Sequence, residues 1–140
     1  MKDITTRTIV IEDYEFINKW WIEHGEKSPP KLTDLPDKGL GGVIVEKNGK
    51  PICVNYLYLT NSSMCYLANA ISNPNYKGKD RFDIIQILLD ECVRRAHALG
   101  CSFIWCTSTE RGVLERCKKS GFHVVEPKEN IIIKVLSNVR

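Results

Sequence analysis

The fold is decided near the middle of the chain by one stretch, Ser72-Asn73-Pro74-Asn75-Tyr76-Lys77-Gly78-Lys79-Asp80-Arg81-Phe82. It joins a β-rich segment, residues 64–72, to the clearest amphipathic helix of the sequence, predicted over residues 81–98. A helix start carries unpaired backbone N–H groups and partial positive charge, so it suits an anion such as phosphate. Lysine and arginine crowd this one, although cations oppose the dipole there. The stretch therefore predicts either a phosphate-binding loop or a solvated basic loop in which Asp80 caps the helix.

The chain before this stretch predicts a strand, a helix and a flexible segment. Residues 7–11 are β-rich, and Asp13 is a candidate cap for the helix that follows. Spacings of three, four and seven residues define one face of that helix, which carries Ile17, Trp20, Trp21 and His24. A proline pair lies within the flexible segment, residues 25–39, and breaks any helix there.

Three consecutive strands are predicted to form an antiparallel meander. The first begins at residue 43, the second covers 52–59 and the third covers 64–72. Asn48-Gly49 is a strong tight-turn signal between the first two strands, because both residue types tolerate positive φ.

The chain after the decisive stretch predicts a parallel crossover. Gly100 ends the long helix, and residues 103–106 form a short strand parallel to 64–72. Thr107 and Glu110 have capping-box spacing and open a second helix, which ends at Ser120. A final hairpin is predicted from two segments, 122–126 and 131–136. The whole order predicts a mixed α+β sheet.

Length and composition predict one domain over residues 1–140. The chain has 140 residues and a formal net charge of +3, which is too small to indicate nucleic-acid binding. No apolar run approaches the roughly twenty residues of a membrane-spanning helix. The N-terminus lacks the apolar run of a secretory signal, so we expect a cytoplasmic protein without a membrane partner.

The six cysteines are expected to be reduced and mostly structural. They contain no C-x-x-C pair, and most have apolar neighbours, where a free cysteine behaves as a small hydrophobic residue. His97 and His123 have no partner at metal-ligand spacing, so no metal site is predicted.

The decisive stretch resembles the acetyl-CoA loop of the GNAT superfamily of N-acetyltransferases, whose pattern is V-x-P-x-Y-R-G-x-G-x-G. Pro74, Tyr76 and Gly78 match, and Lys77 keeps the basic character. Three residues also agree with the later family pattern N-x-x-A-x-x-L-Y-x-K-x-G-F: Lys119, Gly121 and Phe122. The likeness covers residues 65–136, and earlier residues match by element order only. Residues 57–62 are similar to a stretch of small GNAT-like proteins carried by tailed phages.

This resemblance implies a GNAT-like fold with a mostly antiparallel sheet, one parallel strand–helix–strand crossover and helices on both faces. It implies acetyl-CoA (coenzyme A) as the donor and an N-acetyltransferase that acts by direct attack of an amine in a ternary complex. The residues that the resemblance implies for cofactor binding are Ala70, Ile71, Ser72, Tyr76, Lys77, Gly78, Lys79, Asp80, Arg81 and Phe82.

The chain departs from the family at several positions. Asp80 and Phe82 replace two family glycines, so a carboxylate and a ring occupy places where the loop approaches phosphate. Arg81 is expected to supply a direct ion pair instead. Cys117 stands where the family often has a tyrosine that protonates the leaving thiolate. The family's strand glutamate is also missing, because residues 64–70 contain no carboxylate.

Three residues are candidates for the catalytic steps: His24 as a base, Asn69 as a group that orients water, and Cys117 as an acid. The alternative for His24 is a helix-end histidine without chemistry, and Glu23 is a nearby carboxylate off the apolar face. Candidate walls of an acceptor pocket are Trp20, Trp21, Tyr56 and Tyr58. The alternative, which the usual burial of aromatic residues favours for each of them, is a place in the core.

Three functions remain open from the sequence. The first is the acetyltransferase, with a small-molecule or protein amine as acceptor. The second is a non-catalytic GNAT-like module that binds acyl-CoA or a protein, and the third is a basic adaptor on an unrelated sheet. The chain is expected to be a monomer or a homodimer paired through the edge of its final hairpin.

Overall fold

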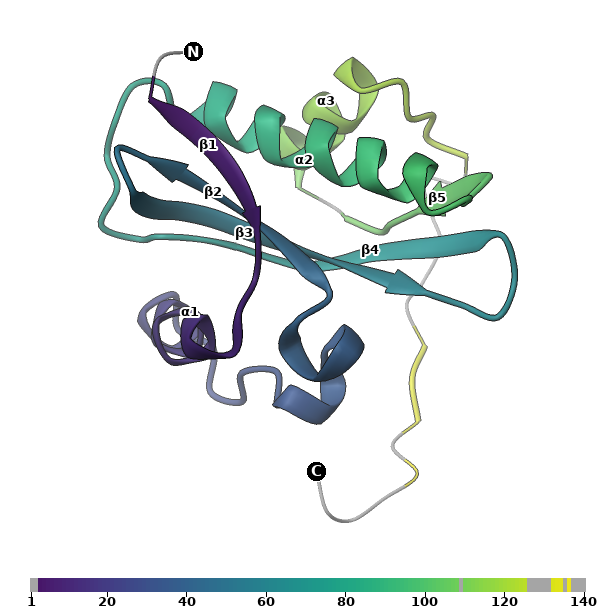
Figure 1. The fold of residues 1–140 in the computed structure, drawn as a ribbon, viewed down its shortest axis with the longest axis horizontal. Helices are drawn as coiled ribbons and strands as arrows, with labels where there is room; N and C mark the ends of the chain where they lie inside the picture. The colour runs from purple at the N-terminus through teal and green to yellow at the C-terminus, as the bar shows by residue number, and fades with distance from the viewer. Residues whose placement is uncertain (1–2, 109, 126–131, 135, 137–140) are drawn as a thin grey trace.

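The protein is one five-stranded sheet covered by helices on both faces, in a computed structural model that describes residues 3–108, 110–125, 132–134 and 136 (Figure 1). The strands lie side by side in chain order: β1 (Ile4–Thr8), β2 (Gly42–Lys47), β3 (Lys50–Leu59), β4 (Met64–Ser72) and β5 (Phe103–Trp105). The first four are antiparallel, and β5 pairs parallel to β4. The predicted α+β sheet with one parallel crossover is confirmed.

The helices form two layers. On one face lie α2 (Arg81–Ala98) and α3 (Arg111–Lys119), and on the other lies α1 (Tyr14–Glu23) (Figure 1). Three 3₁₀ turns accompany α1 in the N-terminal part: Ile11–Asp13, Leu32–Asp34 and Pro36–Gly39. Each layer has its own buried cluster, one between the sheet and α2 and one between the sheet and α1. This two-layered burial stabilises the sheet from both sides.

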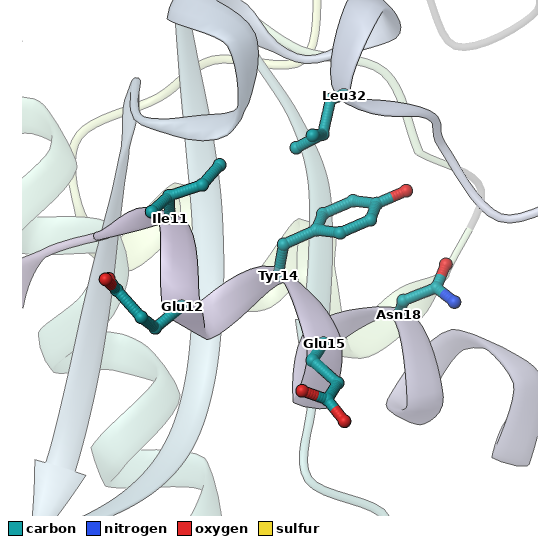
Figure 2. A pocket seen from close by; sticks show the side chains of 6 residues that line it. All are labelled: Ile11, Glu12, Tyr14, Glu15, Asn18 and Leu32. Atoms are coloured by element: carbon teal, nitrogen blue, oxygen red, sulfur yellow. The ribbon is translucent and has the colours of Figure 1, made fainter.

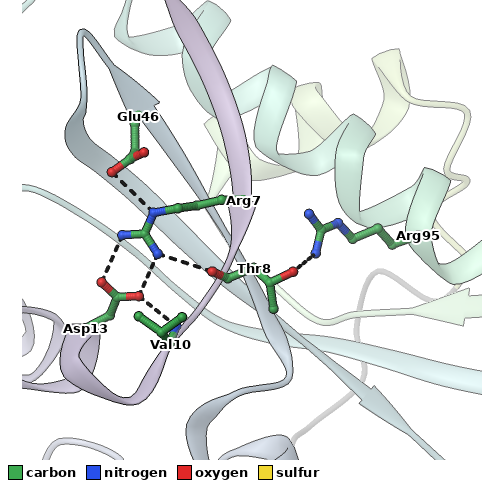
Figure 3. A network of polar contacts seen from close by, with 6 residues as sticks. All are labelled: Arg7, Thr8, Val10, Asp13, Glu46 and Arg95. Carbon is green, nitrogen blue, oxygen red and sulfur yellow. Dashed lines mark hydrogen bonds and ion pairs between the residues drawn. The ribbon is translucent and has the colours of Figure 1, made fainter.

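The first strand lies three residues earlier than predicted, because Asp13 turns the chain out of the sheet. The Asp13 carboxylate accepts a hydrogen bond from the Val10 N–H at 2.8 Å and two from the Arg7 guanidinium at 2.8 and 2.9 Å (Figure 3). Arg7 also pairs with Glu46 of β2 at 3.3 Å. Asp13 therefore closes the 3₁₀ turn before α1, and its side chain makes no cap bond to α1 itself, contrary to the prediction.

The meander contains the predicted turn and an unpredicted irregularity. Asn48 and Gly49 both have positive φ, 53° and 77°, as a tight β2–β3 turn requires. The register of β3 against β4 shifts by one residue between the pairs Val54–Ile71 and Tyr56–Ala68. Asn69 lies within this shift with a φ of 59°, a left-handed conformation that asparagine tolerates. The shift is a β-bulge in β4, close to its end.

The last third of the chain differs from the prediction in two places. Helix α3 begins at Arg111 without a side-chain cap, so the expected Thr107–Glu110 capping box does not form. The Thr107 hydroxyl instead lies 3.3 Å from the Tyr66 hydroxyl. For the predicted final hairpin, residues 122–125, 132–134 and 136 belong to no described strand, and its other residues lie outside the described part.

Candidate functional site

The site begins where β4 leaves β5. The two strands pair only over Met64–Tyr66 and Phe103–Trp105, and β4 then continues to Ser72 with no strand of the described chain on that side. Figure 1 shows the two strands diverging from this point. The bulge at Asn69 lies in the diverging part, and Ala70 next to it is exposed. Backbone N–H and C=O groups along this open edge can therefore accept a ligand as they would accept another strand.

The start of α2 lies directly beyond the open end of β4. Asp80 is the residue before the helix, and its side chain makes no cap bond, so the first N–H groups of α2 keep no partner within the helix. The Arg81 guanidinium donates to the Ser72 hydroxyl at 2.8 Å, which links the helix start to the strand end. Lys77 and Lys79 are exposed in the loop between them. This geometry suits an anion.

The Asp80 carboxylate does not repel an anion here, because an ion pair with a lysine of β2 neutralises its charge. Its carboxylate forms an ion pair with Lys47 of β2 at 2.6 Å and accepts a short hydrogen bond from the Tyr76 hydroxyl. The hydrogen bond from Lys47 lowers the pKa of Asp80, and the same bond raises the pKa of Lys47. The expected helix cap is thus replaced by a link between the loop and β2.

Gly78 makes room for this link. A Cβ at Gly78 would lie 2.2 Å from the Tyr76 hydroxyl oxygen and 2.7 Å from a carboxylate oxygen of Asp80. The sequence suggested that glycine serves close approach of a ligand to the backbone. In the structure the space beside Gly78 is instead filled by Tyr76 and Asp80, which are held beneath the loop.

Two cations that the sequence analysis did not single out for this site join it from α3. The Arg116 guanidinium lies 4.5 Å from the centre of the Phe82 ring, and the Lys119 ammonium lies 5.3 Å from it. Phe82, which replaces a family glycine, thus lies between the start of α2 and cations of the last turn of α3. The amphipathic pattern of α3 contained these cations, but only the packing of α3 against α2 brings them to Phe82.

His24 connects the end of α1 to the end of β4. Its Nε2 atom lies 2.9 Å from the Ser72 carbonyl oxygen. Because a carbonyl only accepts, this contact requires a proton on Nε2, which leaves Nδ1 as the nitrogen able to take up a proton. The structure therefore brings His24 to the predicted strand end, with one of its two nitrogens already used.

Asn69 and Tyr58 form a short polar chain on the α1 face of the sheet. The Asn69 side-chain amide donates to the Tyr58 hydroxyl, which in turn donates to the Asp34 carbonyl at 3.0 Å. Burial raises the pKa of Tyr58 and outweighs the opposite effect of Asn69. Tyr58 is therefore a neutral phenol that connects the bulge to the segment after α1.

The four predicted pocket aromatics divide between core and surface. Trp20 and Tyr56 are buried in the cluster beneath α1, the alternative that the sequence left open. Burial raises the pKa of Tyr56, whose hydroxyl has no hydrogen-bond partner in the described chain. Trp21 and Tyr58 are partly buried. Two aromatic residues that no sequence motif indicated, Tyr66 and Trp105, lie where β4 and β5 diverge, with ring centres 4.8 Å apart.

Cys117 lies in the core beneath α3 and not on an open surface. Its Sγ atom is 4.0 Å from the Cys106 Sγ atom. A hydrogen bond between the two thiols lowers the pKa of Cys106 and raises that of Cys117, so Cys117 stays protonated. All six cysteines are free.

Other surface features lie apart from this site. Figure 2 shows a pocket at the start of α1, lined by Ile11, Glu12, Tyr14, Glu15, Asn18 and Leu32. Within the described ranges, no helix is long and apolar enough to cross a membrane. No group of three or more His, Cys, Asp or Glu side chains in the same ranges is arranged to hold a metal ion.

Comparison with solved structures gives several acetyltransferases. One is an acetyltransferase from Trypanosoma brucei, with a TM-score of 0.66, 14% identity, and coverage of 94% of this chain and 100% of that one. Another is the ribosomal-protein-S18-alanine N-acetyltransferase from Escherichia coli, with a TM-score of 0.70, 13% identity, and coverage of 88% and 79%.

A third is the N-acetylglutamate synthase from Neisseria gonorrhoeae complexed with coenzyme A and L-arginine. Its TM-score is 0.68 and its identity 17%, over 90% of this chain and 28% of that one. No family model and no curated protein matches the sequence. The likeness to these structures therefore shows the fold, and the chain has the GNAT fold of these acetyltransferases.

Proposed function

We propose that this protein is an N-acetyltransferase that moves the acetyl group of acetyl-CoA to an amine. One observation carries the proposal: the open end of β4 leads directly into a cation-rich helix start whose only adjoining carboxylate in the loop, Asp80, is neutralised by Lys47. An extended ligand that carries phosphate at one end fits this arrangement. The fold shared with acetyltransferases supports the same reading.

The chain's own residues divide the binding of such a donor between two elements. The loop and helix start, residues 76–82, would hold the phosphates through N–H groups and cations. The main chain of Ala70, Ile71 and Ser72 would run beside the rest of the donor along the open edge. A backbone N–H on this edge is the group that would polarise a thioester carbonyl.

The transfer needs a proton acceptor for the amine and a proton donor for the thiolate. When bound, acetyl-CoA would supply the activated acetyl thioester that an amine attacks as the C–S bond breaks. His24 would accept the amine proton at Nδ1, since Nε2 donates to the Ser72 carbonyl. Asn69 would orient the acceptor or a water through the polar chain it forms with Tyr58.

The leaving thiolate would take its proton from Cys117 or from solvent. Cys117 holds its proton, but its burial beneath α3 separates it from the open edge. Cys117 would act as the acid only if α3 moves. Solvent is otherwise the source of the proton.

The acceptor would bind on the α1 face of the divergence. Tyr58, Tyr66 and Trp105 follow one another across β3, β4 and β5, with ring centres 6.2 and 4.8 Å apart. Trp21 lies partly exposed on α1. Aromatic faces attract ammonium groups, so this row fits a cationic amine as acceptor.

The direct test is acetyl transfer in solution. The purified chain is incubated with acetyl-CoA and a panel of amines: a polyamine, an aminoglycoside, free amino acids, and peptides with a free N-terminus or a lysine. We expect release of free thiol together with one acetylated amine, identified by mass spectrometry. Tight CoA binding without turnover on any amine would favour the non-catalytic binding module. Absence of CoA binding would contradict both readings.

A further inference from the structure

Three cations lie close to Phe82 at the start of α2. Arg81, Arg116 and Lys119 form no ion pair in the part of the chain that the structure describes. The Nε atom of Arg116 is buried and has no hydrogen-bond partner there. Burial lowers the pKa of Arg116, and the nearby charge of Arg81 lowers it further. The nearby Glu110 carboxylate acts in the opposite direction without reversing this lowering of the pKa, so a bound anion would stabilise the cluster.

The Arg116 side chain runs back along α3 toward the beginning of that helix. A Cβ at Gly112 would lie 3.7 Å from the Nη1 atom of Arg116, so the guanidinium lies against the first turn of α3. Arg116 itself belongs to the last turn of α3, whereas Arg81 is the first residue of α2, where a cation opposes the helix dipole. An anion between the two guanidinium groups would offset their mutual repulsion and, at Arg81, the dipole of α2.

The surrounding contacts hold Arg116 in this place. The Gln86 side chain of α2 donates to the Arg116 carbonyl at 3.1 Å and to the Ser120 hydroxyl at 2.6 Å. Ser120 in turn donates to Asp90 of α2. The Arg116 guanidinium also packs on the Phe82 ring, 4.5 Å from its centre. Packing between α2 and α3 thus fixes the position of Arg116.

We propose that Arg116, acting from α3 with Arg81 of α2, binds the diphosphate of the acyl-CoA donor, with Lys119 beside them. This inference rests on the proposed function and deepens it. Phe82 prevents the close backbone approach that a glycine permits, and two guanidinium groups replace those backbone contacts. Guanidinium suits this role because its planar fork matches phosphate oxygens in pairs.

The test compares two arginines of the same helix. Arg116→Ala removes the proposed contact, and Arg111→Ala removes an equal charge from an exposed arginine that pairs with Glu115 at 3.1 Å. Calorimetric titration with CoA should show about tenfold weaker binding for Arg116→Ala, about 1.4 kcal/mol, and unchanged binding for Arg111→Ala. Circular dichroism and thermal melting check that both variants fold. Arg116→Lys, which keeps the charge but not the fork, should recover only part of the loss.

A second titration identifies which phosphate is bound. With 3′-dephospho-CoA, which keeps the diphosphate, Arg116→Ala should show the same relative loss as with CoA. If wild type and Arg116→Ala bound 3′-dephospho-CoA equally well, Arg116 would be assigned to the 3′-phosphate and the proposal would be overturned. Equal CoA affinities of wild type and Arg116→Ala would overturn it while leaving the proposed function intact. Failure of the wild type to bind CoA would reject both.

Discussion

At the scale of single residues, the chain uses charge pairs to set the path of the backbone. Asp13 accepts hydrogen bonds from Arg7 and from the Val10 N–H, so one carboxylate ends β1 and starts the turn into α1 (Figure 3). Asp80 does the same for the loop before α2 through Lys47 and Tyr76. In both cases a predicted helix cap is drawn to a cation of the sheet, because a charged partner offers a stronger hydrogen bond than a backbone amide alone.

Asp13→Asn should destabilise the protein by about 1–3 kcal/mol, because it removes the charge from hydrogen bonds to a partly buried guanidinium. Burial raises the pKa of Asp13, but the hydrogen bonds from Arg7 and Val10 outweigh burial and lower the pKa below its ordinary value. The stabilisation is therefore present above the usual aspartate range and is lost as the pH falls through the lowered value. Urea unfolding at several pH values measures it.

The comparison of wild type with Asp13→Asn should show a gap in unfolding free energy that is constant near neutral pH and narrows in acid. The matched control is Glu12→Gln at the exposed neighbouring position. Its unfolding free energy should equal that of the wild type at each pH. A gap independent of pH would contradict the assigned role of Asp13.

Gly78→Ala should lower the free energy of unfolding, and it should do so only while the Tyr76 side chain is present. The added Cβ would lie 2.2 Å from the Tyr76 hydroxyl, so the ring must move and release Asp80. Overpacking of this kind typically costs about 1–3 kcal/mol. In a double-mutant cycle with Tyr76→Ala, the cost of Gly78→Ala should fall, which thermal or urea unfolding detects. Additive costs would show that Gly78 is needed for another reason.

At the scale of elements, the sequence predicts the meander and the crossover because their signals are local. Asn48-Gly49 specifies its turn by conformation alone, and the apolar stripe of α2 specifies the face that meets the sheet. The bulge at Asn69 and the clustering of Arg116 with Phe82 had no such local signal. Both depend on contacts between elements that only the folded chain brings together.

For the candidate site, the sequence likewise predicted the position of the main chain but not the contacts of the side chains. Its loop, residues 76–82, and the strand end at Ser72 are adjacent in the structure as the motif implied. The roles of its side chains were not predictable, because Asp80 pairs with Lys47, which lies 33 positions earlier in the chain. Similarly, the burial of Trp20, Tyr56 and Cys117 follows from helix packing that the spacing of residues left open.

Gln86→Leu should loosen α3 from α2. The change removes the hydrogen bonds to Arg116 and Ser120 and costs about 1 kcal/mol. The cost is partly offset because the side-chain amide oxygen of Gln86 is buried and finds no partner among the described residues. Hydrogen exchange should quicken in α3 and stay unchanged in β2 and β3. Uniform quickening over the whole chain would mean a global loss of stability and would contradict this local role.

At the scale of the whole molecule, the proposed function places the donor's phosphates on one face of the sheet and the acceptor on the other. The cations at the start of α2 and on α3 lie on one side of the divergence, and the aromatic row of Tyr58, Tyr66 and Trp105 crosses the other side. The small net charge of +3 is therefore less informative than its distribution. The cations concentrate where the start of α2 meets side chains from the last turn of α3.

The double variant Lys77→Ala and Arg81→Ala should weaken CoA binding by at least about tenfold, since each charge-assisted hydrogen bond contributes about 1.5–3 kcal/mol. Lys19→Ala with Lys27→Ala removes the same charge from exposed positions in the α1 layer and is the matched control. Calorimetry measures both. Equal losses in the two double variants would mean that only net charge matters.

Calorimetric titration of the wild-type chain with CoA and with pantetheine, which lacks the phosphates, tests whether the diverging strand and the start of α2 together hold a phosphate-bearing acyl donor. We expect saturable one-to-one binding of CoA and binding of pantetheine at least about tenfold weaker, because the cations around the start of α2 lose their partners. Equal affinities for the two ligands, or no binding of CoA, would contradict it.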